Sequence, residues 1–512
     1  MAVQLELPPT GQPVRRTRSS WVAVLAVVAV TALVTRLIPL VNGGGFFGLG
    51  NYDDGVYFAA AIAFVHGEMP YRDFVLLHPP GIVLALAPFA GVGRLLGEGV
   101  GWAAARLAWM LLGALSAVLV ARILRPAGLT AALVGGLCYA VLYPAVYVET
   151  STQLHGVANT FLLVGLALVV PRLDGRRASM LMLLAGGAFL AAGTTVKIWQ
   201  VAAVAVVLAW QLRTEGVRRA AQVLLGFVFG GVAICLPFFL ADPRVMWHDV
   251  VGAQLGRPGT GVEVLVRMQD IVGLRQYHTE SALVPAVATI GLLVALMLAW
   301  RHPSARLGVG LLAVLTAVLL VSPSWFQHYA ALTAPPLALV VGAAAQTVTD
   351  WLRSLHAAAG VVAAGLMVVV LLAYEAAFGV MSYGTVFPGR TLGRAVADLP
   401  GCVTTDHPAT LIEMDVFGRN LDRGCAPMVD LNGYSYAMER TSGSPLPRRN
   451  DEIWQDLAMR HFCSGRASII IKYVNNNTLS KPNIALVKEW PVLDKVGRFK
   501  LLAPQAASCP TG

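Results

Sequence analysis

The residues best suited to chemistry in this chain form one short stretch after the first apolar segment. The stretch holds an acidic pair, a neighbouring Arg-Asp pair and a histidine that opens a His-Pro-Pro turn: Asp53, Asp54, Arg72, Asp73 and His78. A carboxylate within hydrogen-bond reach can take a proton from an attacking hydroxyl, and a cation can neutralise a departing phosphate. This combination predicts a catalytic loop that faces a lipid-borne substrate.

The two adjacent carboxylates are expected to differ in role. Neighbouring side chains on a helix point about 100° apart, so both do not face one substrate. We favour Asp54 over Asp53 as the base, because Asp54 starts a predicted amphipathic helix over residues 54–66. The alternative is a structural role, because an Asp just before a helix commonly caps it.

The elements that must position this loop are membrane-spanning helices. The chain has 512 residues, of which 56% are hydrophobic and 13% charged, whereas a soluble domain is about 25% charged. Many apolar stretches are long enough to cross the hydrocarbon core. The net charge of +10 comes mostly from short loops between these stretches, which indicates membrane orientation and not nucleic-acid binding.

The basic loops also predict a topology. The first span covers residues 21–41 with the amino terminus in the cytoplasm, and residues 42–100 form a long external loop. Within that loop, residues 82–96 are expected at the outer surface, because a crossing there would put Arg122 and Arg125 outside. Alternating the later apolar runs then gives about eleven spans with the carboxyl terminus outside.

The composition changes at about residue 381, where polar residues rise and long apolar runs stop. We divide the chain into a transmembrane domain, residues 1–380, and an extracytoplasmic α/β domain, residues 381–512. The predicted elements of the second domain are strands over 403–406, 467–473 and 498–502 and a helix over 452–461.

The cysteines fit this division. Four lie in the predicted outer domain, and an even number in an oxidising compartment predicts two disulfides with three pairings open: Cys402, Cys425, Cys463 and Cys509. Cys138 and Cys235 lie in apolar spans and are expected to be inert.

The order of the motifs resembles the C-type glycosyltransferase (GT-C) superfamily, including protein O-mannosyltransferases, lipid A aminoarabinose transferases and actinobacterial arabinofuranosyltransferases. The matching residues are the acidic pair, the His78 turn, Ala104-Ala105-Arg106-Leu107, Thr195-Val196-Lys197 and His328-Tyr329. Many relatives carry an acidic residue at the start of the fourth span, and whether Glu149 fills that role is left open.

The resemblance implies an inverting sugar transfer from a polyprenyl-phosphate carrier to a glycan, lipid or protein acceptor at the outer face of the cell membrane. Mannose is the first expectation for the sugar and arabinofuranose the second. A divalent metal is an open option. The residues expected to bind substrate are Arg72, Asp73, His78, Lys197, His328 and Tyr329.

Plainer interpretations compete with these roles. Arg72 and Asp73 could form a surface ion pair, Lys197 could snorkel, and His328 could sit in an interfacial aromatic belt. For most charges in residues 241–281, plain solvation is the expected role. A transporter or lipid-linked sugar flippase is the main functional alternative, but it would need polar residues at the bilayer midplane. A structural subunit with a partner-binding outer domain is the third interpretation.

Overall fold

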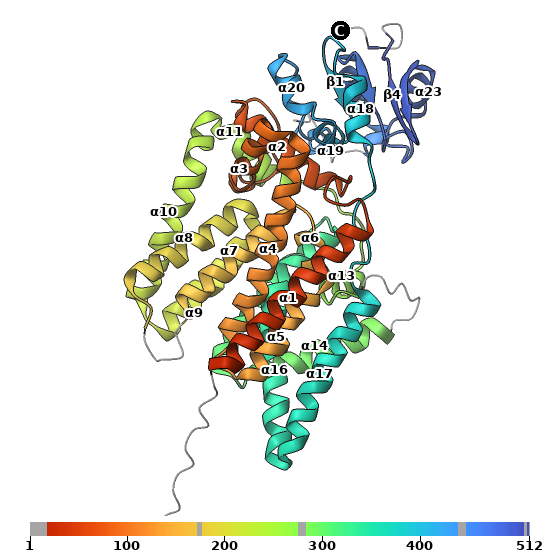
Figure 1. The fold of residues 1–512 in the computed structure, drawn as a ribbon. Helices are drawn as coiled ribbons and strands as arrows, with labels where there is room; N and C mark the ends of the chain where they lie inside the picture. Colours follow the sequence, from red (N-terminus) through yellow and green to blue (C-terminus); the bar gives the residue numbers. More distant parts are fainter. Residues whose placement is uncertain (1–17, 171–176, 275–282, 439–446, 506–508, 511–512) are drawn as a thin grey trace, which may run out of the picture.

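The computed structural model describes residues 18–170, 177–274, 283–438, 447–505 and 509–510. The basic amino-terminal segment up to residue 17 lies outside this description. A bundle of apolar helices makes up most of the molecule, and a small mixed sheet lies at one end of it (Figure 1). The turn between α16 and α17 lies at the other end (Figure 1).

Among the described residues, five helices are long and apolar enough to cross a membrane by themselves. They are α1 (Arg18–Asn42), α4 (Glu98–Leu124), α10 (Val217–Ala241), α16 (Ala334–Leu355) with the 3-10 turn η4 (Gln327–Thr333) before it, and α17 (Ala357–Phe378). A bent pair, α5 (Leu129–Val141) and α6 (Tyr143–Glu149), passes the same test with a 58° break.

The remaining apolar helices are shorter. They are α3 (Gly81–Leu96), α7 (Leu154–Val169), α8 (Met180–Val196), α9 (Val201–Thr214) with η1 (Ile198–Gln200) before it, α14 (Leu283–Ala299) and α15 (Arg306–Val321), which follows η3 (Pro303–Ala305). Each predicted span overlaps one of these apolar helices. The number that cross, and their direction, stay predictions.

A predicted helix near the acidic pair is present as α2 (Tyr52–Val65), but the expectation that it is amphipathic is wrong. Nearly every residue from Asp54 to Ala63 is buried, because α3 covers one side and the outer sheet domain covers another. A glycine permits this approach. A Cβ on Gly55 would lie 2.9 Å from the backbone nitrogen of Ala409, inside normal contact distance.

The segment expected to be a solvated loop, residues 241–281, contains four short helical elements over its described part. They are α11 (Pro243–Trp247), a π-helical turn η2 (His248–Gly252), α12 (Ala253–Leu255) and α13 (Val264–Ile271). Several side chains in them are buried, including Asp249 and Asp270. The segment is therefore part of the packed structure.

The outer domain is built on a four-stranded sheet in the order β1-β2-β4-β3. β1 (Val403–Thr405) pairs in parallel with β2 (Ala467–Ile469), and β4 (Phe499–Leu502) runs antiparallel to both β2 and β3 (Val492–Val496). The helices around the sheet are α18 (Gly389–Ala395), α19 (Pro408–Glu413), α20 (Phe417–Asp422), α21 (Tyr434–Ala437), η5 (Arg448–Asn450), α22 (Glu452–Cys463) and α23 (Lys481–Glu489). Each predicted strand and the predicted helix overlaps an observed one, but β2 is shorter than the predicted strand over 467–473, and β3 was not predicted.

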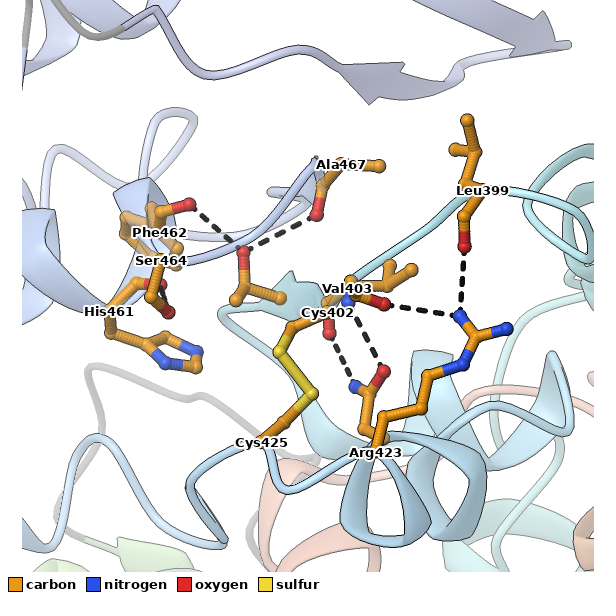
Figure 2. Close-up of a disulfide and its surroundings, with 12 residues drawn as sticks. Leu399, Cys402, Val403, Arg423, Cys425, His461, Phe462, Ser464 and Ala467 are labelled. Atoms are coloured by element: carbon orange, nitrogen blue, oxygen red, sulfur yellow. Dashed lines mark hydrogen bonds between the residues drawn. A yellow bond between two sulfur atoms is a disulfide. The ribbon is translucent and has the colours of Figure 1, made fainter.

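The two predicted disulfides are present, paired as Cys402–Cys425 and Cys463–Cys509. Figure 2 shows the first one, which ties the residue before β1 to the turn after α20. Beside it, the Arg423 guanidinium donates to the carbonyl oxygen of Leu399 at 2.8 Å. The disulfide and this hydrogen bond fix α20 against the edge of the sheet.

The bundle and the outer domain are joined by reciprocal backbone contacts. The Glu98 carboxylate accepts from the backbone N–H groups of Phe417 and Gly418 at 3.1 and 2.5 Å. In return, the Asp415 carboxylate accepts from the backbone N–H of Glu98 at 2.8 Å. The Glu98 carboxylate thus satisfies unpaired backbone donors at the start of α20, and Asp415, just before α20, satisfies one at the start of α4. The two helix ends therefore stabilise one another.

Candidate active site

A cavity of about 370 Å³ lies where the helical bundle meets the outer domain. Its walls come from α2, from the loop before α3, from η4 and from residues 430–472. Four of the residues predicted for the site line it: Asp53, His78, His328 and Tyr329. The other charged residues of the lining are Arg257, Asp430, Arg448 and Lys472.

Asp53 presents its carboxylate to this cavity. The side chain is 36% exposed, and its Oδ2 lies 3.9 Å from Nε2 of His328. Burial in the cavity raises the pKa of Asp53 above its usual value, while nearby cations, Arg257 foremost among them, oppose the rise. The carboxylate can therefore hold a proton more readily than a free aspartate, and it is accessible to a ligand.

Asp54 points elsewhere, into a buried network. Its side chain is fully buried, its Oδ2 accepts from the Tyr383 hydroxyl at 3.0 Å, and Nη2 of Arg106 lies 3.9 Å away. Burial raises the pKa of Asp54 to about 6, and the Arg106 charge opposes this. Asp54 does not line the cavity.

Neither aspartate is the N-cap residue of α2, although the Asp54 carboxylate accepts from the backbone N–H of Gly55 at 2.9 Å. The N-cap is Asn51, whose side-chain oxygen accepts from the backbone N–H of Asp53, and its amide donates to the Tyr147 hydroxyl at 2.9 Å. The capping interpretation of Asp54 is therefore wrong. As expected, the side chains of Asp53 and Asp54 point in different directions, and only Asp53 lines the cavity.

Lys197 lies one layer behind the cavity wall. Its ammonium is 4.4 Å from the ring centroid of Trp199 and 4.8 Å from that of Tyr329, and the residue is 1% exposed. Burial, and secondarily the Arg257 charge, lowers the pKa of Lys197 to about 7, while Asp53 opposes the shift. Lys197 thus supplies positive potential through the aromatic wall, without direct access to the cavity.

Arg257 is a cavity residue that our sequence analysis missed. Its Nη1 donates to the Tyr329 hydroxyl at 3.0 Å, and its guanidinium lies 5.0 Å from the ring centroid of Tyr436. The expectation of plain solvation is wrong for this residue. Arg257 belongs to a run of charges with no motif, so only the folded chain distinguishes it from its neighbours.

The outer domain supplies further polar groups to the cavity. The Arg448 guanidinium lies 5.8 Å from the Tyr436 ring centroid. The Asp430 carboxylate accepts from the Tyr52 hydroxyl at 3.0 Å, and the Lys472 ammonium lies 5.4 Å from the Tyr52 ring centroid. No sequence signal identified these residues, because they reach the cavity only through tertiary packing.

One buried carboxylate shapes the loop that carries Lys472. Asp406, which follows β1, accepts from the backbone N–H groups of residues 471, 472 and 473 at 2.7–2.9 Å. These bonds turn the chain after β2, which is why the strand ends at Ile469 rather than at the predicted residue 473.

Arg72 and Asp73 remain outside the cavity. Their side chains form an ion pair of 2.7 Å with each other, and the Arg72 side chain is 55% exposed. His78 does line the cavity, in an edge-on contact with Tyr57 at a centroid distance of 5.7 Å. Burial lowers the pKa of His78 well below its usual value, so the imidazole is neutral at physiological pH.

Glu149, which could correspond to the acidic residue at the start of the fourth span in many GT-C members, also lies outside the cavity. It is fully buried in an ion pair with Arg36 at 2.5 Å and accepts from the Tyr139 hydroxyl at 2.6 Å. Among the described residues, no three side chains of His, Cys, Asp or Glu converge to hold a metal ion. Nothing in this geometry supports the metal option.

The arrangement combines one accessible carboxylate with several cations and aromatic walls. The carboxylate can accept a proton, the cations can hold an anionic group, and the aromatic rings offer flat apolar surfaces. No protein-family profile matches the sequence, and no curated protein sequence does so either. Solved structures do match.

ArnT from Cupriavidus metallidurans, in its apo state, superposes with a TM-score of 0.60 at 15% identity, over 96% of this chain and 99% of that one. The structure of the same protein bound to undecaprenyl phosphate superposes with a TM-score of 0.53 at 16% identity, over 97% of this chain and 100% of that one. The oligosaccharyltransferase of Archaeoglobus fulgidus, tethered to an acceptor peptide, superposes with a TM-score of 0.57 at 13% identity, over 96% of this chain and 75% of that one. Because these similarities extend through both the helical bundle and the sheet domain, the chain shares the fold of these two proteins.

Proposed function

We propose that this protein is an inverting glycosyltransferase that moves a sugar from a polyprenyl-phosphate carrier to an acceptor hydroxyl at the outer face of the membrane. The observation that carries the proposal is Asp53, an accessible carboxylate in a cavity surrounded by cations at the junction of the two domains. The fold shared with ArnT, which has been crystallised with undecaprenyl phosphate, supports the class of carrier.

Asp53, rather than Asp54, is the proposed general base. The acceptor hydroxyl attacks the anomeric carbon and loses its proton to Asp53. The bond between that carbon and the phosphate oxygen breaks, and the carrier phosphate leaves with the electron pair. No covalent intermediate on the protein is needed, so the configuration at the sugar inverts.

The departing phosphate needs compensating positive charge. Arg257 is the proposed direct contact, because its guanidinium lines the cavity, and Lys197 adds potential from behind Tyr329. His78 and His328 also line the cavity and can hydrogen-bond as neutral imidazoles.

Asp430 and Asn432 offer hydrogen-bonding groups for sugar hydroxyls, while Arg448 and Lys472 supply charge from the outer domain. Mannose remains our first proposal for the sugar and arabinofuranose the second, on the resemblance alone. We also keep the proposed division at residue 380, with the outer domain outside the cell membrane, and propose a glycan, lipid or protein as acceptor.

The test is transfer of radiolabelled sugar from polyprenyl phosphate in proteoliposomes that contain the purified protein. Asp53→Asn keeps the size of the side chain and removes proton acceptance, so turnover should fall by about 10²–10⁴. Asp456→Asn, at an exposed carboxylate paired with Arg460 in the outer domain, is the matched control and should stay near wild type. Full activity of well-folded Asp53→Asn would refute the base, and translocation of the lipid-linked sugar without transfer would favour a flippase.

A further inference from the structure

A second cavity, of about 730 Å³, lies at the end of the bundle away from Asp53. It is bounded by the carboxyl-terminal half of α9 and the amino-terminal half of α15. Much of its lining is apolar and includes Val206, Leu307 and Val314. The proposed function does not use this cavity.

Two arginines and two tryptophans line the same cavity: Trp210, Arg213, Trp300 and Arg306. All four lie at helix ends or in the connections between helices. Tryptophan at the end of an apolar helix is typical of the membrane–water interface, where its ring spans apolar and polar surroundings. The cavity is therefore apolar toward the membrane interior and cationic toward the headgroup level.

The two guanidinium groups are not neutralised by carboxylates of the described residues. Arg306 uses Nε to donate to the carbonyl oxygen of Trp300 at 3.1 Å, and its guanidinium lies 5.7 Å from that ring centroid. Glu215 is the acidic residue close to Arg213 in sequence, but it pairs with Arg219 at 3.1 Å. Both Arg213 and Arg306 are exposed and can bind an anion.

We propose that this cavity binds one anionic diacyl phospholipid of the surrounding leaflet. Arg213 and Arg306 hold the headgroup phosphate, because guanidinium–phosphate pairs form strong, often bidentate hydrogen bonds. The apolar wall takes an acyl chain. A soluble anion would not use that wall, and a zwitterionic lipid would bring its own cation to the arginines.

This proposal is independent of the proposed transfer reaction, because it uses no residue of the Asp53 cavity. It concerns a lipid that stays bound to the protein and is not consumed. Basic pockets between membrane helices near the headgroup level are suited to such lipids. The lipid would contact both α9 and α15, which each contribute residues to the cavity wall.

Native mass spectrometry of the delipidated full-length protein tests the proposal with phosphatidylglycerol, phosphatidylcholine and undecaprenyl phosphate as separate probes. The wild type should retain one phosphatidylglycerol in preference to the other two. The double variant Arg213→Gln with Arg306→Gln should bind phosphatidylglycerol at least about tenfold more weakly, because it loses both charged contacts with the headgroup phosphate.

The matched control is Arg218→Gln with Arg301→Gln, which removes the same charge from two exposed arginines that lie five residues from Arg213 and Arg306 in sequence and do not line the cavity. It should keep wild-type lipid affinity, and the melting temperatures of both double variants should be compared to show that they fold. Equal retention of phosphatidylcholine, tighter retention of undecaprenyl phosphate, or unchanged binding by the Arg213/Arg306 variant would each overturn the proposal.

Discussion

At the scale of single residues, two consecutive aspartates have separate environments. Asp53 faces the cavity, whereas Asp54 joins Arg106 and Tyr383 in a buried network that supports α2. The motif predicted that the pair matters but could not say which member is accessible. Our preference for Asp54 rested on its place at a helix start, and the true start lies earlier, after Asn51.

Asp54→Asn should therefore affect stability more than catalysis. The amide cannot supply the charge that compensates Arg106, so we expect unfolding to become easier by about 1–3 kcal/mol. Turnover per folded molecule should stay within several-fold of wild type. Thermal melting in detergent, together with the transfer assay, measures both quantities. A loss of turnover as large as that of Asp53→Asn, without loss of stability, would return the base to Asp54.

The pH dependence of transfer should report Asp53 and Lys197. Asp53 must be deprotonated to act as a base, and its raised pKa places the acidic limb above that of a free aspartate. Lys197, with its pKa lowered to about 7, loses its positive charge as the pH rises through that value. The ratio kcat/KM should therefore rise and then fall with increasing pH.

The Lys197→Arg variant tests whether the fall of kcat/KM at high pH comes from deprotonation of Lys197 or whether Lys197 has only a structural role. Because a guanidinium stays protonated throughout the range, the decline above about pH 7 should disappear while the acidic limb remains. An alkaline limb that persists unchanged in well-folded Lys197→Arg would assign the decline to another group.

At the scale of elements, the apolar helices were predictable because each keeps a long uninterrupted apolar run. The elements that complete the cavity were not. Arg257 lies on a connection between short helices, and Lys472 lies on a loop whose shape depends on Asp406, a residue 66 positions earlier. β3 was missed because its three apolar and two charged residues do not alternate regularly, and its side chains are mostly exposed.

Asp406→Asn tests whether this loop matters for the site. An asparagine oxygen can replace only part of the three backbone hydrogen bonds, so the loop at residues 471–473 should loosen at a cost of about 1–3 kcal/mol. The expected kinetic result is a rise in KM that matches Lys472→Ala, with kcat less affected, since Asp53 is not displaced. If Asp406→Asn destabilises the domain and leaves KM unchanged, Lys472 has no part in substrate binding.

At the scale of the whole molecule, the cavity exists only when the outer domain is docked on the bundle. Asp53 and Arg257 come from one side, whereas Asp430, Arg448 and Lys472 come from the other. The composition predicted that two regions exist, and the cysteines predicted the disulfides. The docking could not be predicted, because the contacts between Glu98 and α20 join residues more than 300 positions apart with no local signature.

Glu98→Ala is therefore expected to impair the site from a distance. It leaves the backbone N–H groups of Phe417 and Gly418 without their acceptor, so hydrogen exchange should increase in peptides covering α20. The KM for the donor should rise because Arg448 and Lys472 are held less firmly over the cavity. Glu452→Ala, at an exposed carboxylate of the outer domain, should change neither measurement. Faster exchange in α20 with an unchanged donor KM would mean that the bundle alone binds the donor, and the outer-domain cations would then have to serve the acceptor.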